Sequence, residues 1–167
     1  MEKNKKLIPG LPTGFEDRWG KKLYLKKELI KLIEENFIKY GFEPLETPSF
    51  EISSNIGSFL ADDDSNPMSD VFTFNDGEKN ITLRYDLSSP LARFVAQNNQ
   101  ELPLPYKRYA IQNVFRNEKA GNARYREFTQ ADCDIVGNAN PSQSNAELCN
   151  LIAVSYTHLR AHETRIH

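Results

Sequence analysis

The chain has 167 residues, of which 39% are hydrophobic and 26% charged, and its net charge is −2 at neutral pH. This is the size of one ordinary domain with a sizeable core, and its composition is that of soluble globular proteins. No apolar run reaches the ~20 residues of a membrane helix, no secretory signal follows the basic residues 1–6, and the two cysteines lack metal-ligand spacing. We therefore expect a cytoplasmic protein with reduced thiols, no membrane contact and, at most, a local basic patch for nucleic acid.

The first half of the chain contains one clear helix. Proline and glycine in residues 10–20 predict an irregular segment. In residues 21–40, apolar side chains recur at three- and four-residue steps, which predicts an amphipathic helix ended by Gly41. Residues 42–50 contain two prolines and predict an edge or interface strand. Residues 53–69 predict a loop, whose acidic triplet at 62–64 favours solvent exposure over metal binding.

The second half alternates strands and helices. Residues 71–74 and 80–84 flank Asp76-Gly77 and predict a hairpin. Ser88 or Ser89 is expected to cap a helix that ends before residues 102–105. Residues 106–117 and 125–136 predict two long strands, and residues 141–153 a helix with a capping box at 144–147. This order predicts an α+β fold, an antiparallel sheet with helices on one face.

The last residues differ from the rest. All three histidines, His158, His162 and His167, lie within the final ten positions. Residues 154–167 resemble translated adapter sequence, so we expect an artefactual tail after a domain formed by residues 1–153. The spacing of His158 and His162 suits a metal on a helix, but the tail interpretation is favoured and no metal site is predicted. The natural chain is then expected to be longer.

The most informative chemistry surrounds the long hairpin. Between residues 106 and 126 one acid, Glu118, stands against six basic residues: Lys107, Arg108, Arg116, Lys119, Arg124 and Arg126. Arginine side chains suit phosphate oxygens, and Phe128 offers a ring to a nucleobase. Gln130, Asp132 and Asp134 share one strand face by period two, which suits the ammonium group of a zwitterion. On chemistry alone, a surface hairpin with solvated charges remains an equal alternative.

Three blocks carry a family resemblance. Phe-Arg-Asn-Glu at residues 115–118, a short glycine-containing loop and Arg-Tyr-Arg-Glu-Phe-Thr-Gln at 124–130 resemble motif 2 of class II aminoacyl-tRNA synthetases, in the version of histidine–tRNA ligases. Residues 82–88 resemble that family's histidine-contacting loop. The helix at 21–40 with Pro48 resembles motif 1, whose proline belongs to a dimer interface. The resemblance spans about residues 10–153 and implies an incomplete class II catalytic domain.

The resemblance implies a nucleotide half and an amino-acid half of one site. On the nucleotide side, catalytic Arg116 would hold the ATP α-phosphate and the amino-acid carboxylate, Glu118 the adenine amino group and Arg124 the γ-phosphate, while Phe128 would stack on adenine. On the amino-acid side, the histidine ammonium group would be received by Asp86 and Ser88, with Gln130, and Leu87 would also belong to the histidine-binding residues. Asp134 would face the imidazole. The sequence departs from the family in that Ser88 replaces the usual threonine and both aspartates replace longer glutamates.

The implied reaction is ATP-dependent activation of L-histidine, with Mg²⁺, followed by transfer to tRNA(His) by a homodimer. Motif 3, a histidine-specific loop and an anticodon-binding domain would follow later in a full protein, so this chain alone is expected to bind ATP weakly without making histidyl-adenylate. Three alternatives stay open: a synthetase-like regulatory subunit of ATP phosphoribosyltransferase, a class II synthetase for another amino acid, and a non-enzymatic arginine-rich binding hairpin.

Overall fold

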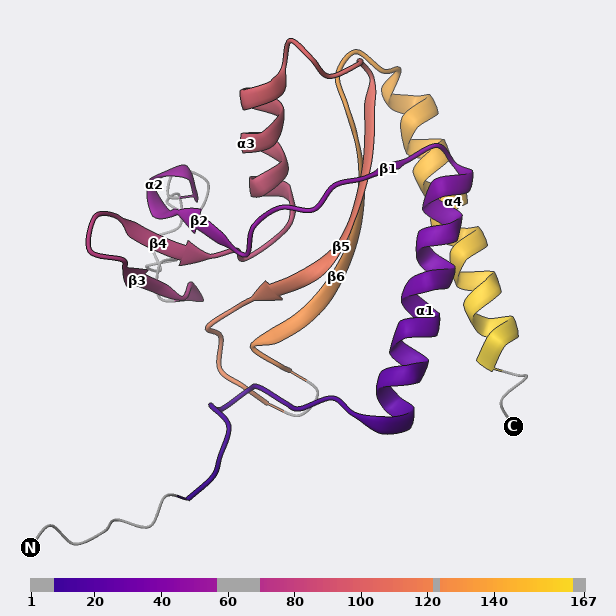
Figure 1. Ribbon diagram of the computed structural model, residues 1–167. Coiled ribbons are helices and arrows are strands. Elements are labelled where there is room, and N and C mark those ends of the chain that lie inside the picture. The colour runs from indigo at the N-terminus through magenta and orange to yellow at the C-terminus, as the bar shows by residue number, and fades with distance from the viewer. Residues whose placement is uncertain (1–7, 57–69, 122–123, 164–167) are drawn as a thin grey trace, which may run out of the picture.

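The structure of the chain is a computed structural model that describes residues 8–56, 70–121 and 124–163, with side chains as far as Thr157. Several expectations fall outside this part: the acidic triplet at 62–64, two residues of the 118–124 loop, and the histidine side chains of the tail. Figure 1 shows the layers: a long curved hairpin stands between α1 and α4 on one side and α3 on the other.

The long hairpin is the centre of the fold. β5 (Tyr106–Phe115) and β6 (Glu127–Val136) pair antiparallel over their whole length, from Tyr106 opposite Val136 to Phe115 opposite Glu127. The short β1 (Glu43–Pro44) adds a parallel pair at the other side of β5. Because side chains alternate along a strand, this register divides the hairpin into two faces.

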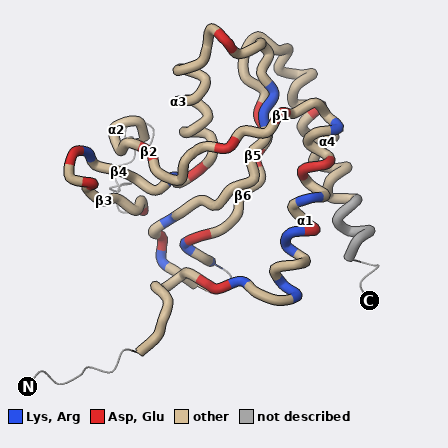
Figure 2. The backbone as a smooth tube through the Cα atoms, in the orientation of Figure 1, with Lys and Arg blue, Asp and Glu red and all other residues tan. Residues whose placement is uncertain are grey.

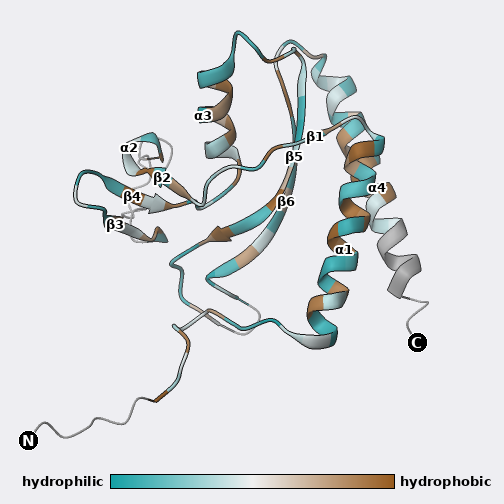
Figure 3. Ribbon diagram, in the orientation of Figure 1, coloured by the Kyte–Doolittle hydropathy of each residue, from teal (hydrophilic) through white to brown (hydrophobic). Residues whose placement is uncertain are grey.

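One face carries the main core. α1 (Gly20–Lys39) and α4 (Pro141–Glu163) lie against it, and Phe37, Phe42, Tyr109 and Leu151 form a buried cluster. Figure 3 shows hydrophobic stretches on both helices. The predicted amphipathic helix is therefore confirmed, and it ends as expected at Gly41, whose φ of 76° suits glycine.

A second, smaller sheet in the described residues has the strand order β2 (Phe50–Ile52), β4 (Asn80–Leu83), β3 (Thr73–Asn75), and a single helical turn, α2 (Ser53–Ile56), follows β2. The predicted hairpin is confirmed: Gly77 has a φ of 105°, and the Asp76 carboxylate accepts hydrogen bonds from the backbone N–H groups of Glu78 and Lys79. The α+β fold is thus confirmed, although its antiparallel strands form two sheets.

Four helix details differ from the sequence prediction. α3 (Ser88–Asn98) lies on the opposite face of the hairpin from α1 and α4, so the helices do not share one face. Its first turn is capped by the carboxylate of Asp86, which accepts from Ser89 N–H at 3.0 Å, and not by a serine. α4 begins after Asn140, whose side chain accepts from Ser142 and Gln143, in place of the predicted capping box; it also continues beyond Ala153.

No helix in the described part of the chain is both long and apolar enough to cross a membrane.

Candidate active site

The residues expected to carry chemistry gather on the hairpin face that looks away from α1 and α4. On β6, Phe128, Gln130, Asp132 and Asp134 alternate along this face. Each stands opposite a residue of β5, and these partners are Val114, Gln112, Ala110 and Arg108. Arg116 N–H donates to the Arg126 carbonyl, and its guanidinium lies 5.1 Å from the centroid of the Phe128 ring, so Arg116 lies beside the Phe128 end of this row.

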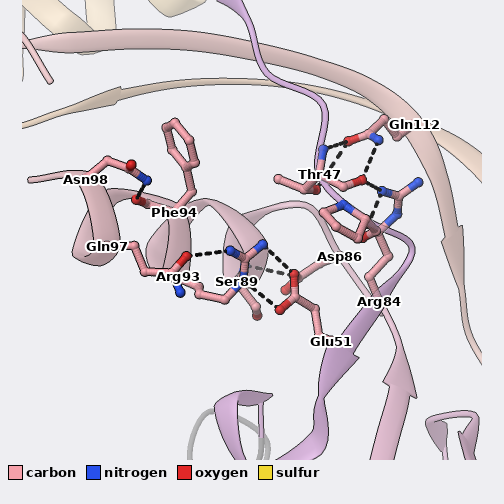
Figure 4. A network of polar contacts seen from close by, with 11 residues as sticks. Thr47, Glu51, Arg84, Asp86, Ser89, Arg93, Phe94, Gln97, Asn98 and Gln112 are labelled. Atoms are coloured by element: carbon pink, nitrogen blue, oxygen red, sulfur yellow. Dashed lines mark hydrogen bonds and ion pairs between the residues drawn. The ribbon is translucent and has the colours of Figure 1, made fainter. Parts of the chain in front are cut away.

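The segment at residues 84–88 lies across this face. Leu87 is 2% exposed and packs on Ala110 and Val114. Arg84, also buried, fixes the start of the segment: Nε donates to the Asn113 carbonyl at 2.6 Å and Nη1 to the Thr47 carbonyl at 2.7 Å. Figure 4 shows this anchor beside the Asp86 cap of α3. The segment at residues 84–88 is therefore held against this hairpin face.

Arg116 occupies one end of the site. Its guanidinium lies between two aromatic rings, 4.5 Å from the centroid of Tyr85 and 5.1 Å from that of Phe128, and its Nε donates to the Tyr85 carbonyl at 3.3 Å. Stacking of this kind orients a planar cation while leaving most of its donors free. The Arg116 guanidinium is thus held in position, and most of its N–H groups remain available to a ligand.

Glu118 is tied to the same end by three contacts. The Tyr85 hydroxyl donates to Oε1 at 3.2 Å, Arg124 Nε lies 3.6 Å from Oε2, and Arg126 Nε donates to the Glu118 carbonyl at 2.9 Å. Burial raises the pKa of Tyr85, opposed by Arg116 and supported by Glu118. Figure 2 shows the basic and acidic positions gathered where β5 and β6 meet their loop. The Arg124 side chain is 67% exposed and reaches toward solvent.

The other end of the face is acidic. Gln130 Nε2 donates to both carboxylate oxygens of Asp132, at 2.9 and 2.8 Å, while its Oε1 is buried without a hydrogen-bond partner. Asp134 Oδ2 lies 2.6 Å from Nη2 of the buried Arg108. The pKa of Asp132 is raised, chiefly by burial, with Asp134 and Asp86 contributing and with Gln130 and Arg108 acting in the opposite sense. A cluster of acids with an unpaired amide oxygen suits an ammonium group.

Most of the predicted site residues therefore lie near one another in the structure, but not all of them do. Asp86 is near enough to influence Asp132 electrostatically, although it also caps α3. Ser88 lines a separate hollow of about 610 Å³ beside α3, with Asn55 and Arg93 among its neighbours. Its predicted role toward the amino acid thus lacks a contact with the other residues of the site.

Two contributors are not evident from the sequence. Tyr85 supports both Arg116 and Glu118, and Arg108 pairs with Asp134 across the hairpin. The pairing of Arg108 with Asp134 follows from the register of β5 and β6. Sequence alone leaves that register undetermined, because it places the ends of the two strands only to within several residues.

The side chains at the Arg116 end of the face suit a nucleotide. Free guanidinium donors and aromatic rings at one end suit phosphates and a base. Among the residues whose placement is described, no three His, Cys, Asp or Glu side chains are grouped so that they would hold a metal ion.

Known proteins resemble this chain in sequence. A sequence model of the family described as histidyl-tRNA synthetase matches residues 14–167. The histidine–tRNA ligase of Pelagibacter ubique (strain HTCC1062) is 82% identical over 153 residues, which are 92% of this chain and 33% of that protein. That of Rhodopseudomonas palustris (strain BisB18) is 44% identical over 91% of this chain and 29% of its own length. The chain thus spans about a third of these relatives.

Solved structures show the same fold. The histidyl-tRNA synthetase from Nostoc sp. PCC 7120 superposes with a TM-score of 0.75 at 26% identity, covering 89% of this chain and 34% of that one. A protein from Bacillus halodurans C, named as an ATP phosphoribosyltransferase regulatory subunit/histidyl-tRNA synthetase, gives a TM-score of 0.74 at 24% identity over 93% of this chain and 38% of its own.

Proposed function

This chain belongs to the histidyl-tRNA synthetase family, and we propose that the whole protein of which it forms a part activates L-histidine with ATP and transfers it to tRNA(His). The observation that carries the proposal is the single hairpin face with a held, donor-rich cation at one end and an acidic cluster at the other. Such a face suits the binding of two reactants side by side, a nucleotide phosphate at the cationic end and an amino acid at the acidic end.

The nucleotide would occupy the end near Arg116. Arg116 would hold the α-phosphate and the amino-acid carboxylate, where added negative charge develops during attack on phosphorus. Glu118 would accept from the adenine amino group, Arg124 would reach the γ-phosphate from its exposed position, and Phe128 would stack on adenine. Mg²⁺ would be bound mainly by phosphate oxygens, as it is at most nucleotide sites.

Histidine would occupy the acidic end. Its ammonium group would be received by Gln130 and Asp86, with Leu87 forming the buried floor, and its imidazole would face Asp134. Ser88 would join this set through a change of its side-chain position. The reaction then needs little covalent chemistry from the protein, since the side chains align the carboxylate with the α-phosphorus and stabilise charge.

Partners and location follow from the same proposal. We expect a homodimer formed through the motif 1 region around α1 and Pro48, tRNA(His) as the acceptor, and action in the cytoplasm. The alternative is a synthetase-like regulatory subunit, a function that the Bacillus halodurans protein carries in its name. Retention of Arg116, Glu118 and Arg124 together favours the synthetase, because a histidine sensor has no need to hold three parts of ATP.

The test is a chimaera in which residues 14–153 replace the matching segment of the Pelagibacter ubique enzyme, assayed by histidine-dependent ATP–pyrophosphate exchange. Exchange is expected, and Arg116→Ala should lower kcat by about 10²–10³-fold. Lys79→Ala, which removes an exposed cation from the other hairpin, is the matched control and should leave exchange unchanged. A chimaera that folds, binds histidine and yet shows no exchange would support the regulatory alternative.

A further inference from the structure

Arg108 is the most unusual side chain of the site. It is fully buried, 0% exposed, in the middle of the molecule, and its Nε and Nη1 have no hydrogen-bond partner. A buried arginine with unpaired donors lowers stability relative to an apolar side chain of similar size. Its presence therefore needs a reason other than the stability of the fold.

Its one engaged nitrogen joins the segment at residues 84–88 to β6. Nη2 donates to the Leu87 carbonyl at 3.0 Å and lies 2.6 Å from Asp134 Oδ2. Leu87 belongs to the segment that carries Asp86, whereas Asp134 belongs to β6. A single atom of β5 thus sets the spacing between the segment and the acidic end of the hairpin.

We propose, on the basis of the proposed function, that Arg108 is a positioning residue for the amino-acid half of the site. It holds Asp134 by one oxygen, Oδ2, which is buried, and that side chain keeps a 35% exposed surface that would meet the ligand. It also supplies the positive charge that allows Asp86, Asp132 and Asp134 to lie close together. Arg108 itself touches neither reactant.

This role predicts an effect on histidine and not on ATP, because the ATP half is held separately at the far end of the face. There Arg116 stacks on Tyr85 and Phe128, and Glu118 accepts from the Tyr85 hydroxyl. In the chimaera, Arg108→Met keeps the length of the side chain and removes the charge. It should raise the KM for histidine about tenfold or more and change the KM for ATP less than twofold. Arg108→Lys, which keeps the charge, should restore part of the affinity.

Two further variants separate positioning from folding. Arg93→Met removes a different ion pair, the bidentate contact between the Arg93 guanidinium and the Glu51 carboxylate. This variant should have a lower melting temperature and an unchanged KM for histidine. Adding Asp134→Asn to Arg108→Met should produce less than the product of the two separate effects, because both act through one contact.

The outcomes are distinct. An unchanged KM for histidine in Arg108→Met, or equal rises in both KM values, would overturn the positioning role. If Arg108→Met does not fold, the ratio of the two KM values in Arg108→Lys decides in the same way. Absence of exchange in the parent chimaera would instead refute the proposed function, and the role of Arg108 with it.

Discussion

Asp86 serves the fold and, in the proposed site, the ligand as well. Its carboxylate caps α3 through Ser89 N–H, and it lies close enough to raise the pKa of Asp132. Asparagine caps a helix about as well as aspartate does, but it carries no charge. The two roles are therefore separable by substitution.

We predict that Asp86→Asn keeps the stability of the chain and weakens histidine binding, whereas Asp86→Ala loses both, with a fall of about 1 kcal/mol in the free energy of unfolding. Urea denaturation of the chain and the histidine KM of the chimaera measure the two effects. Equal loss of stability in both variants would show that the cap depends on the charge.

The surroundings of Asp132 disfavour its charged carboxylate form. Burial is the main reason that the pKa of Asp132 is raised in the folded chain. Its contribution to the free energy of unfolding is therefore fully present below its ordinary pKa of 3.8. That contribution is lost as the pH rises through the pKa of the folded chain. Asp132→Asn should therefore raise the melting temperature at about pH 7, and the gain should disappear below pH 3.8. A gain of the same size at both pH values would assign the effect to packing.

At the residue scale, the sequence could place Phe128, Gln130 and Asp134 on one face of a strand, because side chains alternate along a strand. Their roles toward a ligand stay predictions. Arg108 and Tyr85 depend on which residues lie opposite one another across the fold, and tertiary packing decides that.

At the scale of elements, Arg84 joins segments that are far apart in the sequence. It is 4% exposed and donates to the carbonyls of Thr47, Pro48 and Asn113, which lie on the chain before β2 and on β5. The long helices and strands were predictable from periodicity, and the Asp-Gly turn from its residues. The turn of helix α2 was not, because residues 53–69 were predicted as a loop. The division into two sheets and the place of α3 were not, since they depend on such long-range contacts.

We predict that Arg84→Met lowers the free energy of unfolding by about 3 kcal/mol, because it leaves buried carbonyls without donors. Thermal and urea denaturation measure the loss. Lys79→Met, on the exposed turn between β3 and β4, is the matched control and should stay within about 0.5 kcal/mol of the parent. A similar small effect for both variants would mean that water replaces the lost donors.

At the scale of the whole molecule, the activity expected of this chain alone is limited, because the chain matches only part of its relatives. It matches about a third of their length, and we expect the groups that complete activation to lie in the remainder. The chain should therefore bind ATP weakly, as seen by ligand-observed NMR, and Arg116→Ala should abolish the signal. Histidine-dependent pyrophosphate exchange by the unmodified chain would contradict this expectation.

The edge of β6 that does not face β5 leads to a further prediction about the molecule in solution. Within the described residues, the ten-residue β6 pairs with no strand other than β5, although the Glu127 carbonyl accepts from Arg18, and Tyr125 beside it is 43% exposed. Long unpaired edges favour association between chains. The chain should therefore self-associate as its concentration rises, measured by light scattering after size-exclusion chromatography, whereas the chimaera, in which further chain is available to cover the edge, should reach a constant mass. A mass independent of concentration for the isolated chain would show that the edge is already protected.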